Sequence, residues 1–153
     1  MALLMYGNVV WHPYLKRQSI QLERVQRRAT KALSQCKNMT YYQRLIYLQL
    51  PSLKGRRLRG DLIDTYKMLT AIQTSTQTSY FLINKFDKTR NSNNKLFMRH
   101  CNTNIRKFSF SYRVVKHWNI LTDYIKSAPN LNAFKGLLDT HPKIITSYTD
   151  FDE

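Results

Sequence analysis

Hydrophobic residues recur at intervals of three and four positions along much of the chain, which is the spacing of one face of an α-helix. The clearest stripe consists of Leu58, Leu62, Tyr66 and Leu69. A second one consists of Phe110, Val114, Trp118 and Leu121. Five segments show this pattern, and the spacing predicts helices over about 19–33, 40–48, 52–72, 109–121 and 129–139.

Residues typical of helix starts and helix ends flank most of these segments. Ser19 is the expected N-cap of the first helix, and Thr40 has capping-box spacing with Gln43 at the start of the second. Pro51 ends the second helix and Ser52 begins the third. A proline at a first-turn position marks the start of the last predicted helix.

The stretches outside the predicted helices have other residue patterns. The run YGNVVWHPY at 6–14 is β-branched and aromatic, which favours a buried segment leading into a turn. TSTQTS and TRNSNNK are polar loops, and between and after them YFLINKF and KLFM are strands or docking segments. We expect a mainly α fold over 1–153, a single domain built as an irregular bundle of about five helices, with a loop-rich middle at about 74–104 and a disordered tail at about 143–153.

The charge balance narrows the class of partner. The chain has 25 Lys and Arg against nine Asp and Glu, for a formal net charge of +16 and a pI near 10.1. Residues 1–70 hold 13 of the basic residues and three of the acidic ones, so the excess is not confined to a tail. A charge of this size predicts a polyanionic partner.

The first predicted helix carries the densest basic run, LERVQRRATK. Helical spacing places four cations along one side, namely Arg24, Arg27, Arg28 and Lys31. A second, apolar stripe consists of Leu22, Val25, Ala29, Ala32 and Leu33. Only Glu23 is placed to offset the cations, within reach of Arg27. The pattern fits either a solvated helix face or a surface for a polyanion.

Two further clusters favour the polyanion. One consists of Lys54, Arg56, Arg57 and Arg59 at the start of the third helix, and the other of Arg106, Lys107, Arg113 and Lys116. We expect these twelve residues to contact phosphates of RNA or DNA without reading sequence. Phe108, flanked by basic residues, is a candidate for stacking on a base, whereas Trp118 is expected in the core.

The sequence gives little support for metal binding, catalysis or membrane insertion. Cys36 and Cys101 lack metal-site spacing, the four histidines are dispersed, and Asp61 and Asp64 are expected to pair within their helix with Arg57 and Lys67. No metal, cofactor, small-molecule substrate or catalytic residue is predicted. No apolar run reaches the length of a membrane span, and the N-terminus lacks the features of a signal peptide. We expect a nuclear or cytoplasmic protein that is not secreted.

Four blocks add a family resemblance: VVWHPYLKRQSIQLERVQRRATK, RLIYLQLPSLKGRRLRGDLIDTYKML, IRKFSFSYRVVKHWN and SAPNLNAFK. In this order they resemble the region downstream of the polymerase palm in non-LTR (LINE-type) retrotransposon endonuclease/reverse transcriptase polyproteins. The family's motif residues fall on Trp11, Pro13, Glu23 to Thr30, Arg56 to Leu62, Arg113 to Val115, Trp118 and Asn119. Related elements often carry proline where this chain has Thr122.

The resemblance implies a fragment of an RNA-directed DNA polymerase. The chain contains no Asp-Asp pair to hold the two metal ions of polymerisation, so it is predicted to be inactive alone. Its start inside the first block is expected of a truncated copy or a mispredicted gene. The function expected is nonspecific nucleic-acid binding. The alternatives are a packing module that docks on the missing polymerase and, less favoured, a binder of anionic lipid surfaces.

Overall fold

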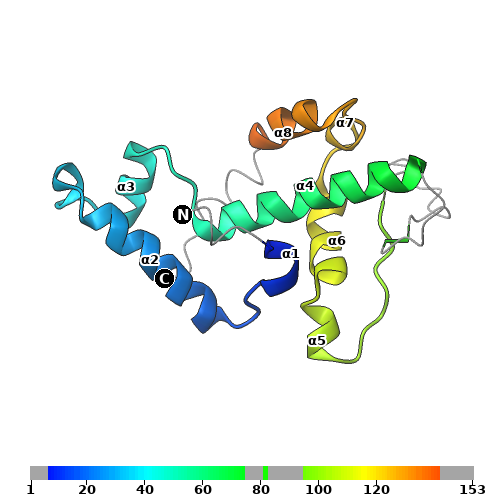
Figure 1. The fold of residues 1–153 in the computed structure, drawn as a ribbon, viewed down its shortest axis with the longest axis horizontal. Helices are drawn as coiled ribbons and strands as arrows, with labels where there is room; N and C mark the ends of the chain where they lie inside the picture. Colours follow the sequence, from blue (N-terminus) through cyan, green and yellow to red (C-terminus); the bar gives the residue numbers. More distant parts are fainter. Residues whose placement is uncertain (1–6, 75–80, 83–94, 142–153) are drawn as a thin grey trace. The chain divides into compact units, whose positions relative to one another are not determined.

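The computed structural model describes residues 7–74, 81–82 and 95–141, and helices dominate this part of the chain (Figure 1). The helices are α1 (Asn8–Trp11), α2 (Lys16–Lys31), the 3₁₀ turn η2 (Ser34–Cys36), α3 (Tyr41–Tyr47), α4 (Leu53–Thr74), α5 (Asn104–Lys107), α6 (Phe110–Ile120), α7 (Asp123–Lys126) and α8 (Leu131–Asp139). The mainly α prediction is confirmed. The five predicted helices correspond to α2, α3, α4, α6 and α8, whereas the short helices were not predicted.

Local capping sets two of the helix starts as predicted. Thr40 and Gln43 form a reciprocal capping box at α3. The Ser52 hydroxyl accepts a hydrogen bond from the Gly55 backbone N–H at 3.1 Å and so caps α4. The predicted N-cap at Ser19 is wrong, because α2 begins at Lys16 and Ser19 lies inside it. Its hydroxyl instead accepts a hydrogen bond from Arg57 at 3.0 Å.

The structure corrects two other predictions, one about burial and one about a helix start. Residues 8–11 form one helical turn in which Val10 is 89% exposed, so the buried segment predicted there is wrong at that residue. The last helix begins at Leu131, where the side chain of Asn130 accepts from the Ala133 N–H at 2.8 Å. A polar side chain that caps the backbone therefore sets this start, two residues after the proline.

The chain divides into two compact units, residues 1–59 with 141–153 and residues 60–140, here called the first and second units. The prediction of one domain stays a prediction. Within the predicted loop-rich middle, residues 75–80 and 83–94 lie outside the described part, and so does the predicted tail at 143–153. The described residues 81–82 and 95–103 contain no helix, and the Phe97 N–H donates to the Leu82 carbonyl at 2.7 Å.

In the first unit, α2 lies beside α3 (Figure 1). The face that α2 turns inward is polar. The buried residues of α2 are Glu23, Gln26 and Thr30, which lie three and four positions apart. Val25 of the predicted apolar stripe is 50% exposed, and Leu33 is also exposed. The apolar stripe of α2 therefore does not face the interior at these two residues.

Hydrogen bonds explain why a polar face is tolerated inside. The Gln26 amide nitrogen donates to the Pro51 carbonyl at 3.0 Å, and the Thr30 hydroxyl donates to the Gln26 carbonyl at 2.9 Å. The Glu23 carboxylate accepts from the Tyr41 hydroxyl and from the Leu53 backbone N–H, the latter at 3.1 and 3.2 Å. These contacts give most of the buried polar groups a partner and so reduce the cost of burying them, although the side-chain oxygen of Gln26 accepts no hydrogen bond from the described residues.

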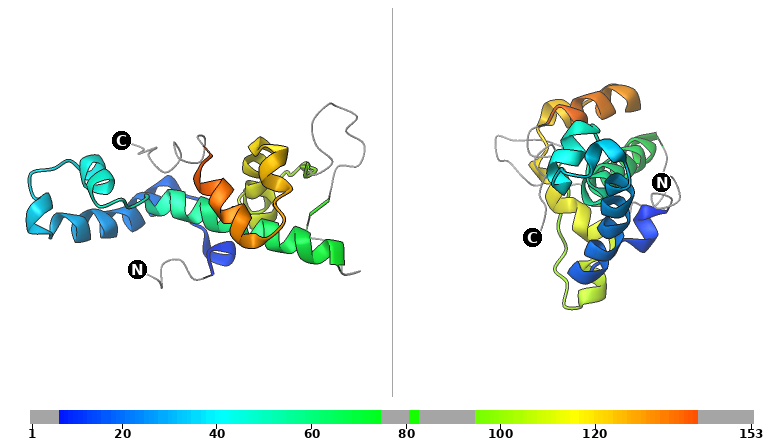
Figure 2. Two further views of the ribbon diagram at one scale, coloured as in Figure 1. Left: turned by 90° about the horizontal axis from the view of Figure 1, so that it is seen from above. Right: turned by 90° about the vertical axis from the view of Figure 1, so that its left-hand side faces the viewer.

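Aromatic rings occupy part of the core of the second unit, and two of them, Tyr66 and Trp118, lie on the predicted apolar stripes. The rings of Tyr66 and Phe134 stack with centroids 4.3 Å apart, and Trp118 lies 6.0 Å from Phe134. The Tyr66 hydroxyl donates to the Ala128 carbonyl at 2.7 Å. Figure 2 shows α8 alongside α4, and the stacking of Tyr66 on Phe134 joins the two helices. Trp118 is buried, which confirms its predicted place in the core.

A bidentate ion pair joins α4 to α6 within the second unit. The Arg113 Nε and Nη2 donate to the two carboxylate oxygens of Asp61, each at 3.0 Å. Arg113 also donates to the Phe108 carbonyl at 3.3 Å. Because Asp61 is buried, the guanidinium compensates a charge that has lost its water.

Replacing Arg113 by Gln is expected to destabilise the second unit by about 3–5 kcal/mol, since a buried carboxylate then loses its charge partner. The loss is measured by urea unfolding followed by circular dichroism. The matched control is Lys116→Gln on the exposed side of the same helix, for which a change within about 0.5 kcal/mol is expected. Equal stabilities of the two variants would contradict a structural role for Arg113.

Candidate nucleic-acid interface

The first unit presents a surface with cations and no exposed acid among its described residues. Residues 1–59 contain twelve Lys and Arg and a single acidic residue, Glu23. Glu23 is only 9% exposed, and its oxygens are engaged by Tyr41 and Leu53. Nothing acidic on this surface therefore offsets the field of the basic side chains.

Four exposed cations lie in one row on α2, here called the basic stripe: Arg17, Arg24, Arg28 and Lys31. Their spacings of seven, four and three residues keep them on one side of the helix, away from buried Glu23 and Gln26. With a rise of 1.5 Å per residue, the row is about 21 Å long. A rigid row of cations is suited to a chain of phosphates, because it binds charge without reading bases.

The stripe differs from the predicted set at two positions. Arg17 was not predicted, although its place seven residues before Arg24 is a signal that could have found it. Arg27 is half-buried, with its guanidinium 4.8 Å from the centroid of the Tyr41 ring. It packs α2 against α3 by a cation–π contact and lies beside the stripe.

Tyr41 makes this cation–π contact and also donates a hydrogen bond to Glu23. Burial raises the pKa of its hydroxyl well above the ordinary value, and the hydrogen bond to Glu23 raises it further, while the nearby charges of Arg27 and Arg44 oppose the shift. The phenol therefore stays protonated and can donate to the Glu23 carboxylate at every physiological pH.

The predicted cluster at the start of α4 belongs to the same unit but is not uniformly exposed. Lys54 is exposed, and Arg56 and Arg59 are half-buried. Arg57 is 2% exposed and donates to the Ser19 hydroxyl inside the unit, so it does not present its guanidinium to a ligand. Periodicity could not distinguish Arg57 from Arg56, because the distinction depends on where α2 lies.

The third predicted cluster lies in the second unit. Arg106 and Lys107 are exposed on α5, and Lys116 is exposed on α6. Arg113 is committed to Asp61, an interaction over 52 positions that helical spacing does not predict. The predicted pair of Asp64 with Lys67 is confirmed, with a separation of 3.1 Å.

The described residues contain neither a candidate metal site nor a candidate membrane-spanning helix. No group of three or more His, Cys, Asp or Glu side chains gathers there as a metal site would require. None of the helices described is both long and apolar enough to cross a bilayer.

Comparisons of the chain with models of protein families, with curated protein sequences and with solved structures find no match. The resemblance to retrotransposon polyproteins therefore stays a prediction from the sequence. The basic stripe, with no exposed acid among residues 7–59, is the feature that bears most directly on function.

Converting both Arg24 and Arg28 to Gln is expected to leave the stability of the first unit within about 0.5 kcal/mol per site, because both side chains are exposed. Arg27→Gln should cost about 0.5–1 kcal/mol or more, since it removes the contact with Tyr41. Urea unfolding measures both. Arg27→Lys keeps a cation over the ring and is the control that should recover part of the loss. A double variant less stable than Arg27→Gln would show that the stripe is structural.

Alkaline pH is expected to weaken the contact between Tyr41 and Glu23. Because the folded pKa of Tyr41 lies above its unfolded value of about 10, the contribution is complete below pH 10 and declines as the pH rises above it. Tyr41→Phe should therefore be less stable than the unmodified chain at pH 8, with a smaller difference at pH 11. Urea midpoints measure the difference, and exposed Tyr47→Phe is the control. A difference independent of pH would contradict this role.

Proposed function

We propose that the protein binds RNA or DNA without sequence preference through the basic stripe of α2, as a noncatalytic part of a retrotransposon-derived reverse transcriptase. The supporting observation is the row Arg17, Arg24, Arg28 and Lys31 in a unit whose one acid among residues 7–59 is buried. A protein with this role would act in the nucleus or the cytoplasm.

Charge complementarity distinguishes this role from that of a solvated helix face. Exposed helices of ordinary proteins offset their cations with acids three or four residues away. On α2 the one acid is turned inward, so the cations repel one another unless anions approach. Phosphates of a nucleic acid supply those anions, and the counterions they release drive binding.

A second candidate is a packing module that docks on a polymerase domain. Exposed apolar side chains favour it, namely Val25 and Leu33 on and just after α2 and Ile46 and Tyr47 on α3. A docking surface of this kind binds protein by excluding water, so its affinity changes little with salt. Salt dependence therefore separates the two functions.

Titration of single-stranded RNA and duplex DNA between 50 and 200 mM salt tests the proposal. Affinity for duplex should fall with a log–log slope of about −0.9 per phosphate neutralised, and Arg24→Gln with Arg28→Gln should reduce that slope by about two. Different sequences should be affected equally. The matched control, Lys37→Gln with Lys135→Gln, removes the same charge outside the stripe and should change the slope less.

Affinity that is unchanged between low and physiological salt would contradict nucleic-acid binding by the stripe. Equal effects of the two double variants would show that net charge alone attracts the nucleic acid. In that case the row on α2 would have no special role.

A further inference from the structure

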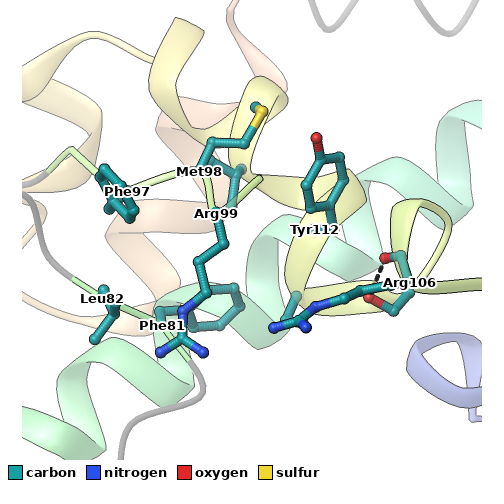
Figure 3. Close-up of a pocket in the computed structure, with 10 residues that line it drawn as sticks. Phe81, Leu82, Phe97, Met98, Arg99, Arg106 and Tyr112 are labelled. Carbon is teal, nitrogen blue, oxygen red and sulfur yellow. Dashed lines mark hydrogen bonds between the residues drawn. The ribbon is translucent and has the colours of Figure 1, made fainter. Parts of the chain in front are cut away.

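The second unit contains a pocket of about 60 Å³ where residues 81–82 and 97–99 meet α5 and the start of α6 (Figure 3). Its floor is apolar, because Phe81 and Val115 are both buried. Tyr112 lines it from α6, and Phe97 lies at its rim with 51% of its surface exposed. An exposed aromatic ring beside an apolar hollow favours a flat ligand.

The rim of the pocket is cationic. Arg99 and Arg106 both line it, and both are exposed. In Figure 3 their guanidinium groups extend toward the same side of the pocket, near Phe81. Among the residues that the structure describes, neither of them forms an ion pair with an acid. The pocket thus combines a ring-binding floor with two donors for an anion.

Size and shape restrict the ligand class further. A volume of 60 Å³ holds about four to six water molecules, which corresponds to one small ring and not to a large fused cofactor. The ligand that has one flat ring and a nearby negative charge, and that suits the cations elsewhere on this chain, is a nucleotide of a nucleic-acid strand. Bases within a duplex are stacked and paired, so only a single strand can offer one.

We propose that this pocket receives one unstacked base of single-stranded RNA or DNA, with Phe97 against the ring and Arg99 and Arg106 on the adjoining phosphates. The proposal rests on the proposed function and specifies its substrate, since it makes single strands the preferred form. Base stacking of this kind changes affinity by about 5- to 150-fold per base.

Fluorescence anisotropy on the full chain tests this with oligouridylate, oligothymidylate and a duplex of equal length. Phe97→Ala should weaken binding of both single strands at least 5-fold and leave duplex affinity unchanged. Phe97→Trp should retain single-strand binding, because it keeps a stacking ring. Arg99→Gln with Arg106→Gln should reduce the single-strand salt slope by about 1.4. The matched control is Ile105→Ala, which removes a 91% exposed apolar side chain that does not line the pocket, and it should change neither affinity.

The outcomes separate this inference from the function it rests on. Single-strand preference that survives Phe97→Ala in a chain with an unchanged circular dichroism spectrum overturns the pocket, while a reduced duplex slope in the Arg24 and Arg28 variant still supports the stripe. If that stripe variant binds both polymers as the unmodified chain does, the proposed function fails. Loss of single-strand binding in Phe97→Trp as well as in Phe97→Ala would also overturn the role assigned to the ring.

Discussion

The buried carboxylate of Glu23 is the contact on which the first unit depends. It accepts hydrogen bonds from Tyr41 at the start of α3 and from the backbone of Leu53 at the start of α4, so one side chain of α2 ties three helices together. The second bond also satisfies an N–H that a helix N-terminus leaves without an intrahelical partner. Because Glu23 is the one acid among residues 1–59, the same burial leaves the surface cationic. Fold and surface charge have a common cause.

Packing α2 through polar side chains has a consequence for its other faces. Glu23, Gln26 and Thr30 occupy the inward positions, so Val25 and Leu33 are left outside. Helical spacing finds this helix correctly but not its inward side, since the polar and apolar stripes share the same period. The usual assumption that the apolar stripe faces the core fails here, because long-range hydrogen bonds to Pro51 and Leu53 stabilise the polar one.

Features with local causes were predictable, and features with distant partners were not. Thr40 and Ser52 cap helices through atoms three residues away, and Trp118 lies on a regular apolar stripe, so the sequence alone sufficed for them. Arg57 and Arg113 look like surface cations in the sequence. Their partners, Ser19 and Asp61, lie 38 and 52 positions away, and only tertiary structure brings them together. The pocket likewise joins segments far apart in sequence.

The two proposed sites respond to different properties of a nucleic acid. A row of exposed cations interacts with any phosphate chain, and its contribution weakens as salt screens it. An aromatic ring over an apolar hollow depends on desolvation and stacking, which salt affects much less. As salt rises, duplex would therefore lose its main source of affinity, whereas a single strand would keep the base contact at Phe97. Arg99 and Arg106 add a salt-dependent part to single-strand binding, so the part of the selectivity that resists salt would be the stacking on Phe97.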